Sequence, residues 1–189
     1  MWNVWSKIKA CLTRWRWQQE QPLWALLPLP KPYLYQGQQV TFTFGPAEAI
    51  GEMLAVERLA YGRLWWRAED FYFDMVGRQN SAYLLAYLDG LLLGFLACRK
   101  QALTLHISNF LLLPAWQGRG LGSYLLKEAK HYARRLHCVK LTLEVREGNV
   151  KAQAFYKKRG FFITGERENY YQQTGESAIL LACLVTSAD

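Results

Sequence analysis

The sequence contains few residues that could bind a metal or form disulfides. Its 189 residues include four cysteines and three histidines. The cysteines lie far apart, with no C-x-x-C pair and no histidine cluster beside them, at Cys11, Cys98, Cys138 and Cys183. We therefore expect neither a zinc site nor a disulfide framework, and no metal cofactor. Scattered thiols of this kind are typical of a reducing compartment, so a cytoplasmic location is expected.

Long apolar runs are also absent. No run reaches the roughly 18 apolar residues of a membrane-spanning helix. The stretch "PLWALLPLP" is interrupted by Pro22, Pro28 and Pro30 and lacks a small-residue cleavage pattern after it, which excludes a secretory signal. With 51% hydrophobic and 15% aromatic residues, the chain is instead expected to fold around one core.

The positive charge is concentrated near the N-terminus. Residues 1–39 contain five basic residues and one acidic residue, which is half of the formal net charge of +8, and five of the eight tryptophans. Such a leader could contact the ribosome, RNA or a membrane surface, or it could form a packed or disordered terminal segment. We divide the chain into this leader with its proline-rich connector, residues 1–39, and a domain over residues 40–189. No specific nucleic-acid recognition is expected.

Hydrophobic periodicity predicts the elements of the domain. We expect a strand over 40–45, a helix over 47–62 with Ile50, Leu54 and Leu59 on its apolar face, and a short helix over 67–78. A hairpin follows around the Asp89–Gly90 turn, and then a strand over 102–113.

The second half alternates helices and strands. A helix beginning at Leu121 carries Leu125, Tyr132 and Leu136 on one face, and the Lys127 side of this helix is basic. A strand over 139–147, a helix from Asn149 to Gly160, and strands over 161–168 and 176–185 complete the chain. This order predicts an α/β sandwich with a mixed sheet.

Three glycines precede the helix at Leu121. In "QGRGLG", Gly118, Gly120 and Gly122 leave main-chain N–H groups uncovered at the positive end of a helix dipole, an arrangement suited to a diphosphate. An ordinary tight turn would have the same sequence, so this motif alone does not identify a function.

The segments that follow make the pattern specific. Gln117, Gly120 and Gly122 precede "LEVREGNVKAQAFYKKRGF", and together these segments closely resemble the GNAT family of acetyl-CoA-dependent N-acetyltransferases. The later "ENYY" and "ESAILLACL" are similar to the RimI type, the ribosomal protein S18 alanine N-acetyltransferases. The resemblance covers roughly residues 40–186. It implies a mixed, mostly antiparallel sheet of about seven strands with helices on both faces. It also implies acetyl-CoA as cosubstrate and a protein N-terminus like that of S18 as acceptor, and leaves the oligomeric state open.

Glu144 is the candidate general base. Strand alternation places Leu141, Leu143 and Val145 on one face and Glu144 on the other. An α-amine has a pKa of about 7.7 to 8.0, so a modest base suffices near neutral pH. The resemblance implies that Glu144 accepts the proton of the amine, directly or through water. The alternative is a solvated carboxylate or an ion-pair partner of Arg146.

Tyr156 and Asn149 also match functional positions of the family. The resemblance implies that Tyr156 gives a proton to the sulfur of coenzyme A, whereas the alternative is a packed core aromatic. Asn149 caps the following helix by position, and its counterpart in the family touches the cofactor.

The resemblance implies a cofactor site built mainly from main-chain groups. Phe110, Leu111 and Leu112 are expected to serve the pantetheine arm and the thioester carbonyl. The turn expected to bind the diphosphate comprises Gln117, Gly118, Arg119, Gly120, Leu121, Gly122 and Ser123. Asn149 is expected to make a further contact with the cofactor. Arg119, Lys157 and Lys158 are candidates for phosphate contacts, with a solvated basic face as the alternative for the lysines.

The acceptor side departs from the RimI pattern. Thr104 and Ser177 replace acidic residues, and Gln172 replaces a proline. Acceptors that remain open are lysine side chains and small amines, and a non-catalytic RNA- or membrane-binding module is a further alternative. Deletion of residues 1–39 distinguishes these classes, since an enzyme is expected to keep its activity. His106 is a weak candidate for substrate contact, whereas His131 and His137 are expected on the surface.

Overall fold

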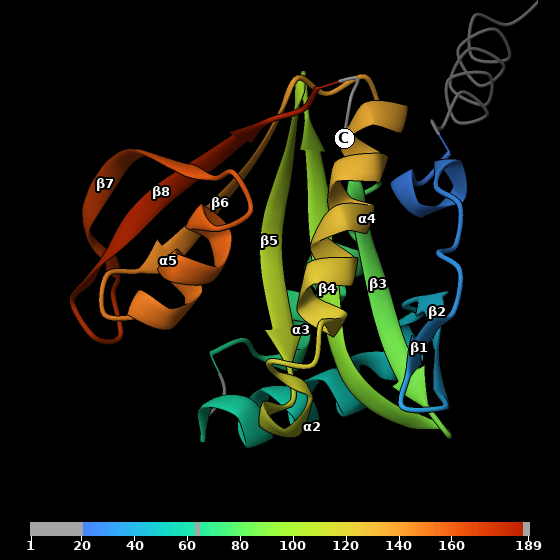
Figure 1. The fold of residues 1–189 in the computed structure, drawn as a ribbon. Coiled ribbons are helices and arrows are strands. Elements are labelled where there is room, and N and C mark those ends of the chain that lie inside the picture. Colours follow the sequence, from blue (N-terminus) through green and yellow to red (C-terminus); the bar gives the residue numbers. More distant parts are fainter. Residues whose placement is uncertain (1–20, 63–64, 187–189) are drawn as a thin grey trace, which may run out of the picture.

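The computed structural model describes residues 21–62 and 65–186, which form an α/β fold around one eight-stranded sheet (Figure 1). The strand order is β1-β2-β3-β4-β5-β6-β8-β7, and every pair is antiparallel except β5 with β6. The strands are β1 (Tyr33–Tyr35), β2 (Gln38–Phe44), β3 (Ser81–Leu88), β4 (Leu91–Gln101), β5 (Thr104–Leu112), β6 (Lys140–Arg146), β7 (Phe162–Tyr171) and β8 (Glu176–Leu184).

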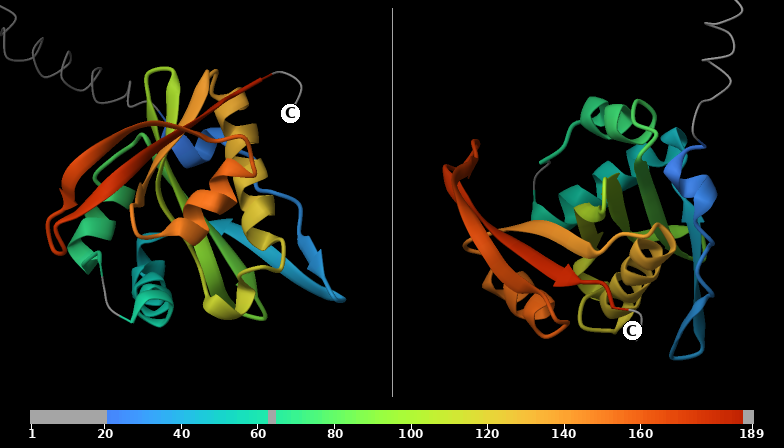
Figure 2. Two further views of the ribbon diagram at one scale, coloured as in Figure 1. Left: turned by 60° about the vertical axis from the view of Figure 1, so that its left-hand side comes forward. Right: turned by 90° about the horizontal axis from the view of Figure 1, so that it is seen from above.

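Helices cover both faces of the sheet (Figure 2). On one face lie α2 (Ile50–Tyr61) and α3 (Ala68–Met75), and on the other lie α4 (Leu121–Arg135) and α5 (Val150–Lys157). Short 3-10 helices are η1 (Leu23–Leu26), η2 (Ala47–Ala49) and η3 (Pro114–Trp116). The predicted fold class, a mixed and mostly antiparallel sheet between helices, is confirmed.

The predicted buried face is confirmed for α4 and is partly wrong for α2. Leu121, Leu125 and Tyr132 are at most 2% exposed in α4. In α2, however, Leu59 is 69% exposed, and the buried face includes Glu57. The reason is a polar contact that hydrophobicity does not reveal, since the Glu57 carboxylate accepts the main-chain N–H of Trp66 at 3.2 Å.

Part of the predicted connector belongs to the sheet. The connector was placed before the domain, within residues 1–39, but β1 pairs with β2 and is the eighth strand of the sheet. Leu23 and Leu27 are buried in the core shared with α4. The other leader predictions fall on residues 1–20, outside the described residues. Within residues 21–39 the structure gives no support for a ribosome or membrane contact. Among all the helices that the structure describes, none has the length and hydropathy of a membrane span.

The parallel pair β5–β6 is short, and the two strands then separate. Their pairing runs from Thr104 opposite Lys140 to Ile107 opposite Leu143. Just beyond this pairing, between Ile107 and Asn109, the register of β5 against β4 shifts. Beyond it β5 stays with β4, whereas β6 stays with β8 and leans away (Figure 1). This wedge between two strands of one sheet positions the candidate site.

The burial of Leu23 predicts that the segment before β1 contributes to folding. Leu23→Ala should lower the free energy of unfolding by about 2–4 kcal/mol, because it removes a buried side chain and leaves a cavity. Leu26→Ala, in the same 3-10 helix but 45% exposed, should change it by less than about 0.5 kcal/mol. Urea unfolding followed by circular dichroism measures both. Equal, small effects would show that this segment does not stabilise the core.

Candidate functional site

The glycine turn adopts the conformation that its sequence predicts. Gly118 and Gly120 have φ angles of +76° and +87°, in the left-handed region that favours glycine. No side chain caps the start of α4, and the first turn of the helix contains no acidic residue. Within the described residues, the amides from Gly118 to Ser123 make no backbone hydrogen bond, and Tyr124 is the first to bond back, to Gly120. The turn therefore presents several free N–H donors to an anion.

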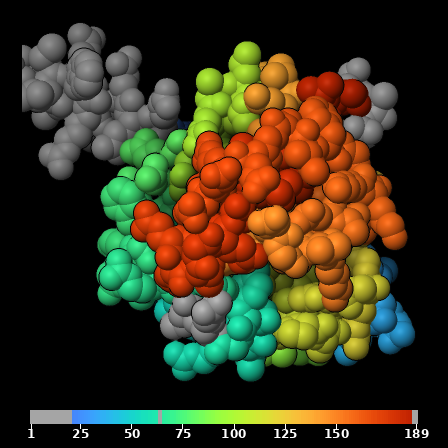
Figure 3. Space-filling view, turned by 90° about the vertical axis from the view of Figure 1, so that its left-hand side faces the viewer, coloured from blue at the N-terminus to red at the C-terminus, as the bar shows by residue number. Residues whose placement is uncertain are grey.

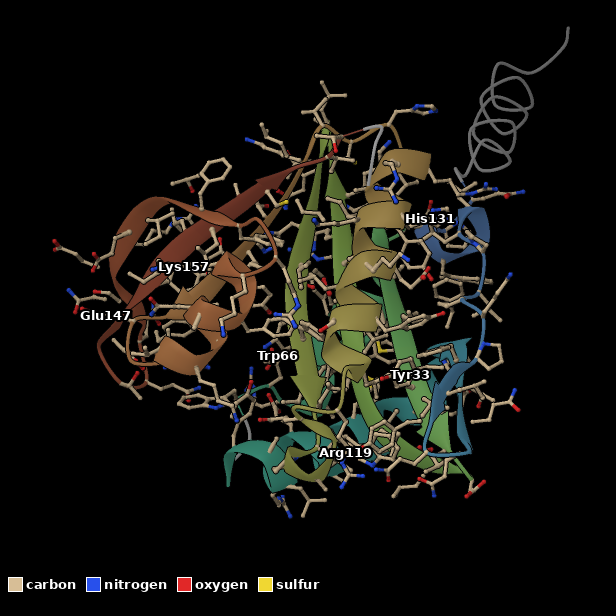
Figure 4. All side chains as sticks on the ribbon, in the orientation of Figure 1. Tyr33, Trp66, Arg119, His131, Glu147 and Lys157 are labelled. Atoms are coloured by element: carbon tan, nitrogen blue, oxygen red, sulfur yellow. The ribbon has the colours of Figure 1, made fainter. Side chains whose placement is uncertain are left out.

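Strand β1 supports this turn from the outside. The Tyr33 hydroxyl donates a hydrogen bond of 2.7 Å to the Arg119 carbonyl, and Figure 4 labels both residues at the lower end of the molecule. A Cβ atom on Gly120 would lie 2.5 Å from that hydroxyl. Substitution of Gly120 would thus disturb Tyr33 as well as the turn itself.

A cavity of about 370 Å³ brings most of the predicted cofactor residues together. Its lining includes Phe110, Leu111, Leu112, Gln117, Gly118, Gly120, Gly122, Ser123, Asn149 and Tyr156. Arg119 and Leu121 are not among the lining residues. The guanidinium of Arg119 packs over Tyr35 and Trp116 instead, and Leu121 is fully buried. Lys157 and Lys158 do not line the cavity either.

A second cavity, of about 520 Å³, continues from the first. The two share Phe110, Asn149 and Tyr156, so they form one groove across the wedge between β5 and β6. Glu144 lines only the second cavity of the two. The groove therefore runs from the glycine turn at one end to Glu144 at the other.

Glu144 lies on the predicted face of β6, opposite the buried Leu143. One carboxylate oxygen contacts Nε2 of His106 at 3.1 Å, and the other lies 3.7 Å from Arg167. Burial alone would raise the pKa of the Glu144 carboxyl, but the His106 hydrogen bond and the charges of His106 and Arg167 hold it below its ordinary value. Glu144 is consequently ionised at neutral pH. Its partner is not Arg146, which pairs with Glu176 at 3.0 Å.

Tyr156 and Asn149 lie where the two cavities meet. Tyr156 packs edge-on against Phe155 and Phe161 and is 7% exposed. Burial, with smaller contributions from neighbouring groups, raises the pKa of its phenol far above the ordinary value, so Tyr156 remains protonated. The Asn149 side chain accepts the Ala152 N–H at 3.0 Å, which confirms the predicted helix cap.

Three features of the groove around Glu144 were not predicted. His106 was expected only as a weak candidate for substrate contact, and it contacts Glu144. The guanidinium of Arg146 lies 3.7 Å from the ring centroids of both Trp65 and Tyr171, and thereby joins the loop after α2 to β7. Trp66, labelled in Figure 4, lines the second cavity together with Glu144. The "WW" pair at this loop was the available sequence signal.

The β7–β8 hairpin forms the outer wall of the groove. Figure 3 shows β7, β8 and α5 gathered on one face of the molecule, beside the start of α4. The Glu176 carboxylate, at the start of β8, accepts the Gly148 N–H at 2.9 Å and so ties the hairpin to the turn before Asn149.

Residues 47–161 match the acetyltransferase (GNAT) family. A Bacillus subtilis protein named as a candidate ribosomal protein bS18-alanine N-acetyltransferase is 32% identical over 116 residues, covering 61% of this chain and 77% of that protein. The Haemophilus influenzae ribosomal protein bS18-alanine N-acetyltransferase is 34% identical over 95 residues, covering 49% of this chain and 64% of that protein.

The solved structure of the ribosomal-protein-S18-alanine N-acetyltransferase from Escherichia coli has the same fold. It superposes with a TM-score of 0.70 at 24% identity, covering 79% of this chain and 96% of that one. The family match extends from η2 through α5 and so includes both ends of the groove. From the family match over residues 47–161 and the common fold, the chain is a member of the GNAT family of acetyltransferases.

Proposed function

We propose that this acetyltransferase transfers the acetyl group of acetyl-CoA to the N-terminal α-amine of a protein, with the N-terminal alanine of ribosomal protein bS18 as its acceptor. Acetyltransferases of this family use acetyl-CoA. The observation that carries the proposal is an ionised Glu144 at one end of a groove and a protonated Tyr156 at its centre. The bS18 acceptor is supported by the names of the two bacterial relatives.

The residues of the first cavity fit the proposed cosubstrate. Free amides at the start of a 15-residue helix suit a diphosphate. Within residues 21–62 and 65–186, the lining contains Lys151 and Arg159 and no aspartate or glutamate, so its charge also favours an anion. When bound, acetyl-CoA supplies an activated acyl group as a thioester. The described residues around it bind, orient and exchange protons.

Glu144 is suited to an α-amine more than to a lysine side chain. A carboxylate with a lowered pKa is a weak base, and it can take a proton from a group with a pKa of about 7.7 to 8.0 more readily than from one at about 10.4. We assign Glu144 as the general base, acting directly or through water. Tyr156, which stays protonated, is assigned as the acid that gives a proton to the departing sulfur.

The acceptor is tested with a panel of amines. Purified protein and acetyl-CoA should release free thiol with a peptide that carries the bS18 N-terminal sequence and begins with alanine. The same peptide with its α-amine already acetylated and with an added lysine is the control, and it should give none even though the lysine side chain is free. Thiol release with the blocked peptide, or only with spermidine, would refute acetylation of the α-amine.

Glu144→Gln should lower kcat by about 10²- to 10⁴-fold, the range expected for a positioned general base. Its Kd for acetyl-CoA, measured by calorimetry, should remain within about twofold because Glu144 does not line the cofactor cavity. Glu147→Gln is the matched control, since this exposed carboxylate lies three residues further along, outside the groove, and is labelled in Figure 4. Full activity in Glu144→Gln would remove Glu144 from the mechanism.

The contact with His106 predicts a change in the acidity of Glu144. His106→Leu should raise the Glu144 pKa, because it removes a hydrogen bond that holds this pKa down. During acidification, Glu144 would then become protonated at a higher pH than in the wild-type protein. A ¹³C NMR titration of the Glu144 carboxyl measures the shift, and His131→Leu, on α4, should leave it unchanged. An unaltered titration in His106→Leu would show that His106 does not set this pKa.

A further inference from the structure

The cofactor cavity contains two cations that were not predicted from the sequence. Lys151 and Arg159 line it from α5 and the turn just after it. Phe155 lies between them in the chain, and the spacing of four residues places all three on one side of the helix. Lys151 donates to the Gln117 side chain at 3.2 Å. Both cations are therefore held by residues that also line the cavity.

Arg159 is fixed by two neighbours. Its guanidinium lies 3.7 Å from the Phe155 ring centroid and donates to the Phe155 carbonyl at 2.7 Å. Its Nε and Nη2 atoms also donate to the Ser123 hydroxyl. These contacts orient a planar group with several N–H donors, so the group is already ordered before any ligand binds.

Two helix ends act on Arg159 in opposite directions: the Phe155 carbonyl, in the last turn of α5, favours a cation, whereas the start of α4 disfavours one. Ser123 is the third residue of α4, so the guanidinium lies at the positive end of that helix, where a cation is disfavoured. Among the residues that the structure describes, no carboxylate lines the cavity to compensate. An anionic ligand near Ser123 would remove this repulsion and would gain a charge-assisted hydrogen bond.

The order of groups along the groove indicates which anion this is. Asn149 and Tyr156 mark the end that joins the acceptor cavity, so the thioester lies there. The glycine turn, Ser123 and Arg159 line the first cavity and not the acceptor cavity, and Arg159 contacts Ser123, the residue that follows Gly122. In coenzyme A the diphosphate is likewise followed by the ribose that carries the 3′-phosphate.

We propose that Arg159 binds the 3′-phosphate of coenzyme A and makes the protein select coenzyme A over its 3′-dephospho form. The assignment rests on the proposed use of acetyl-CoA. It replaces the predicted phosphate contacts of Lys157 and Lys158, which do not line the cavity. Lys157 projects from α5 in the last turn, where a cation is favoured without any ligand (Figure 4).

Calorimetry with coenzyme A and with 3′-dephospho-coenzyme A tests the proposal on the full chain. The wild-type protein should bind coenzyme A about tenfold more tightly or better, as expected for a hydrogen bond to a charged group. Arg159→Met should reduce the ratio of the two dissociation constants to within about twofold, mainly by weakening the binding of coenzyme A. Arg159→Lys should recover part of the ratio, since it restores charge without the planar fork. Lys157→Met is the matched control and should keep the wild-type ratio.

Because both ligands are measured on the same variant, the ratio does not depend on the stability that Arg159 contributes. Equal weakening of both ligands by Arg159→Met would show that Arg159 supports the diphosphate turn and would overturn the 3′-phosphate assignment. An unchanged ratio, or a wild-type protein that does not discriminate, would also overturn it. Failure of the wild-type protein to bind either ligand is a different result, because it would refute the proposed cosubstrate.

Discussion

The separation of β5 from β6 is the constraint on which the site depends. If the parallel pairing continued beyond Ile107 and Leu143, main-chain hydrogen bonds would close the sheet, and no groove would pass between its strands. The separation leaves Phe110 on one wall and Glu144 on the other. Pairing of β5 with β4 and of β6 with β8 keeps both strands in the sheet beyond the point where they separate.

Local sequence patterns predicted the elements that depend on local physics. The alternation around Glu144, the Asn149 cap and the buried face of α4 follow from strand period, side-chain capping and helix period, and the structure contains all three. The glycine turn was recognisable for the same reason, since its positive φ angles are a property of its own residues. The assigned chemical roles of Glu144 and Tyr156 stay predictions.

What the sequence did not predict depends on contacts between distant segments. The pairing of Glu144 with His106, rather than Arg146, requires the register of β5 against β6. Burial of Glu57 requires the path of the loop to Trp66. Lys157 and Lys158 were candidates for phosphate contacts, with a solvated basic face as the alternative, whereas the residues that line the first cavity are Lys151 and Arg159, at helical spacing from Phe155.

The contact between Tyr33 and the glycine turn changes how this protein can be shortened. The family match begins at residue 47, and the predicted domain begins at residue 40, yet the hydroxyl under the Arg119 carbonyl comes from residue 33. A fragment that begins at either boundary lacks this hydrogen bond and also lacks two side chains of the core, Leu23 and Leu27. If such a fragment bound coenzyme A weakly, the cause would be the missing hydrogen bond from Tyr33 to the glycine turn. The result would give no information about what residues 1–20 do.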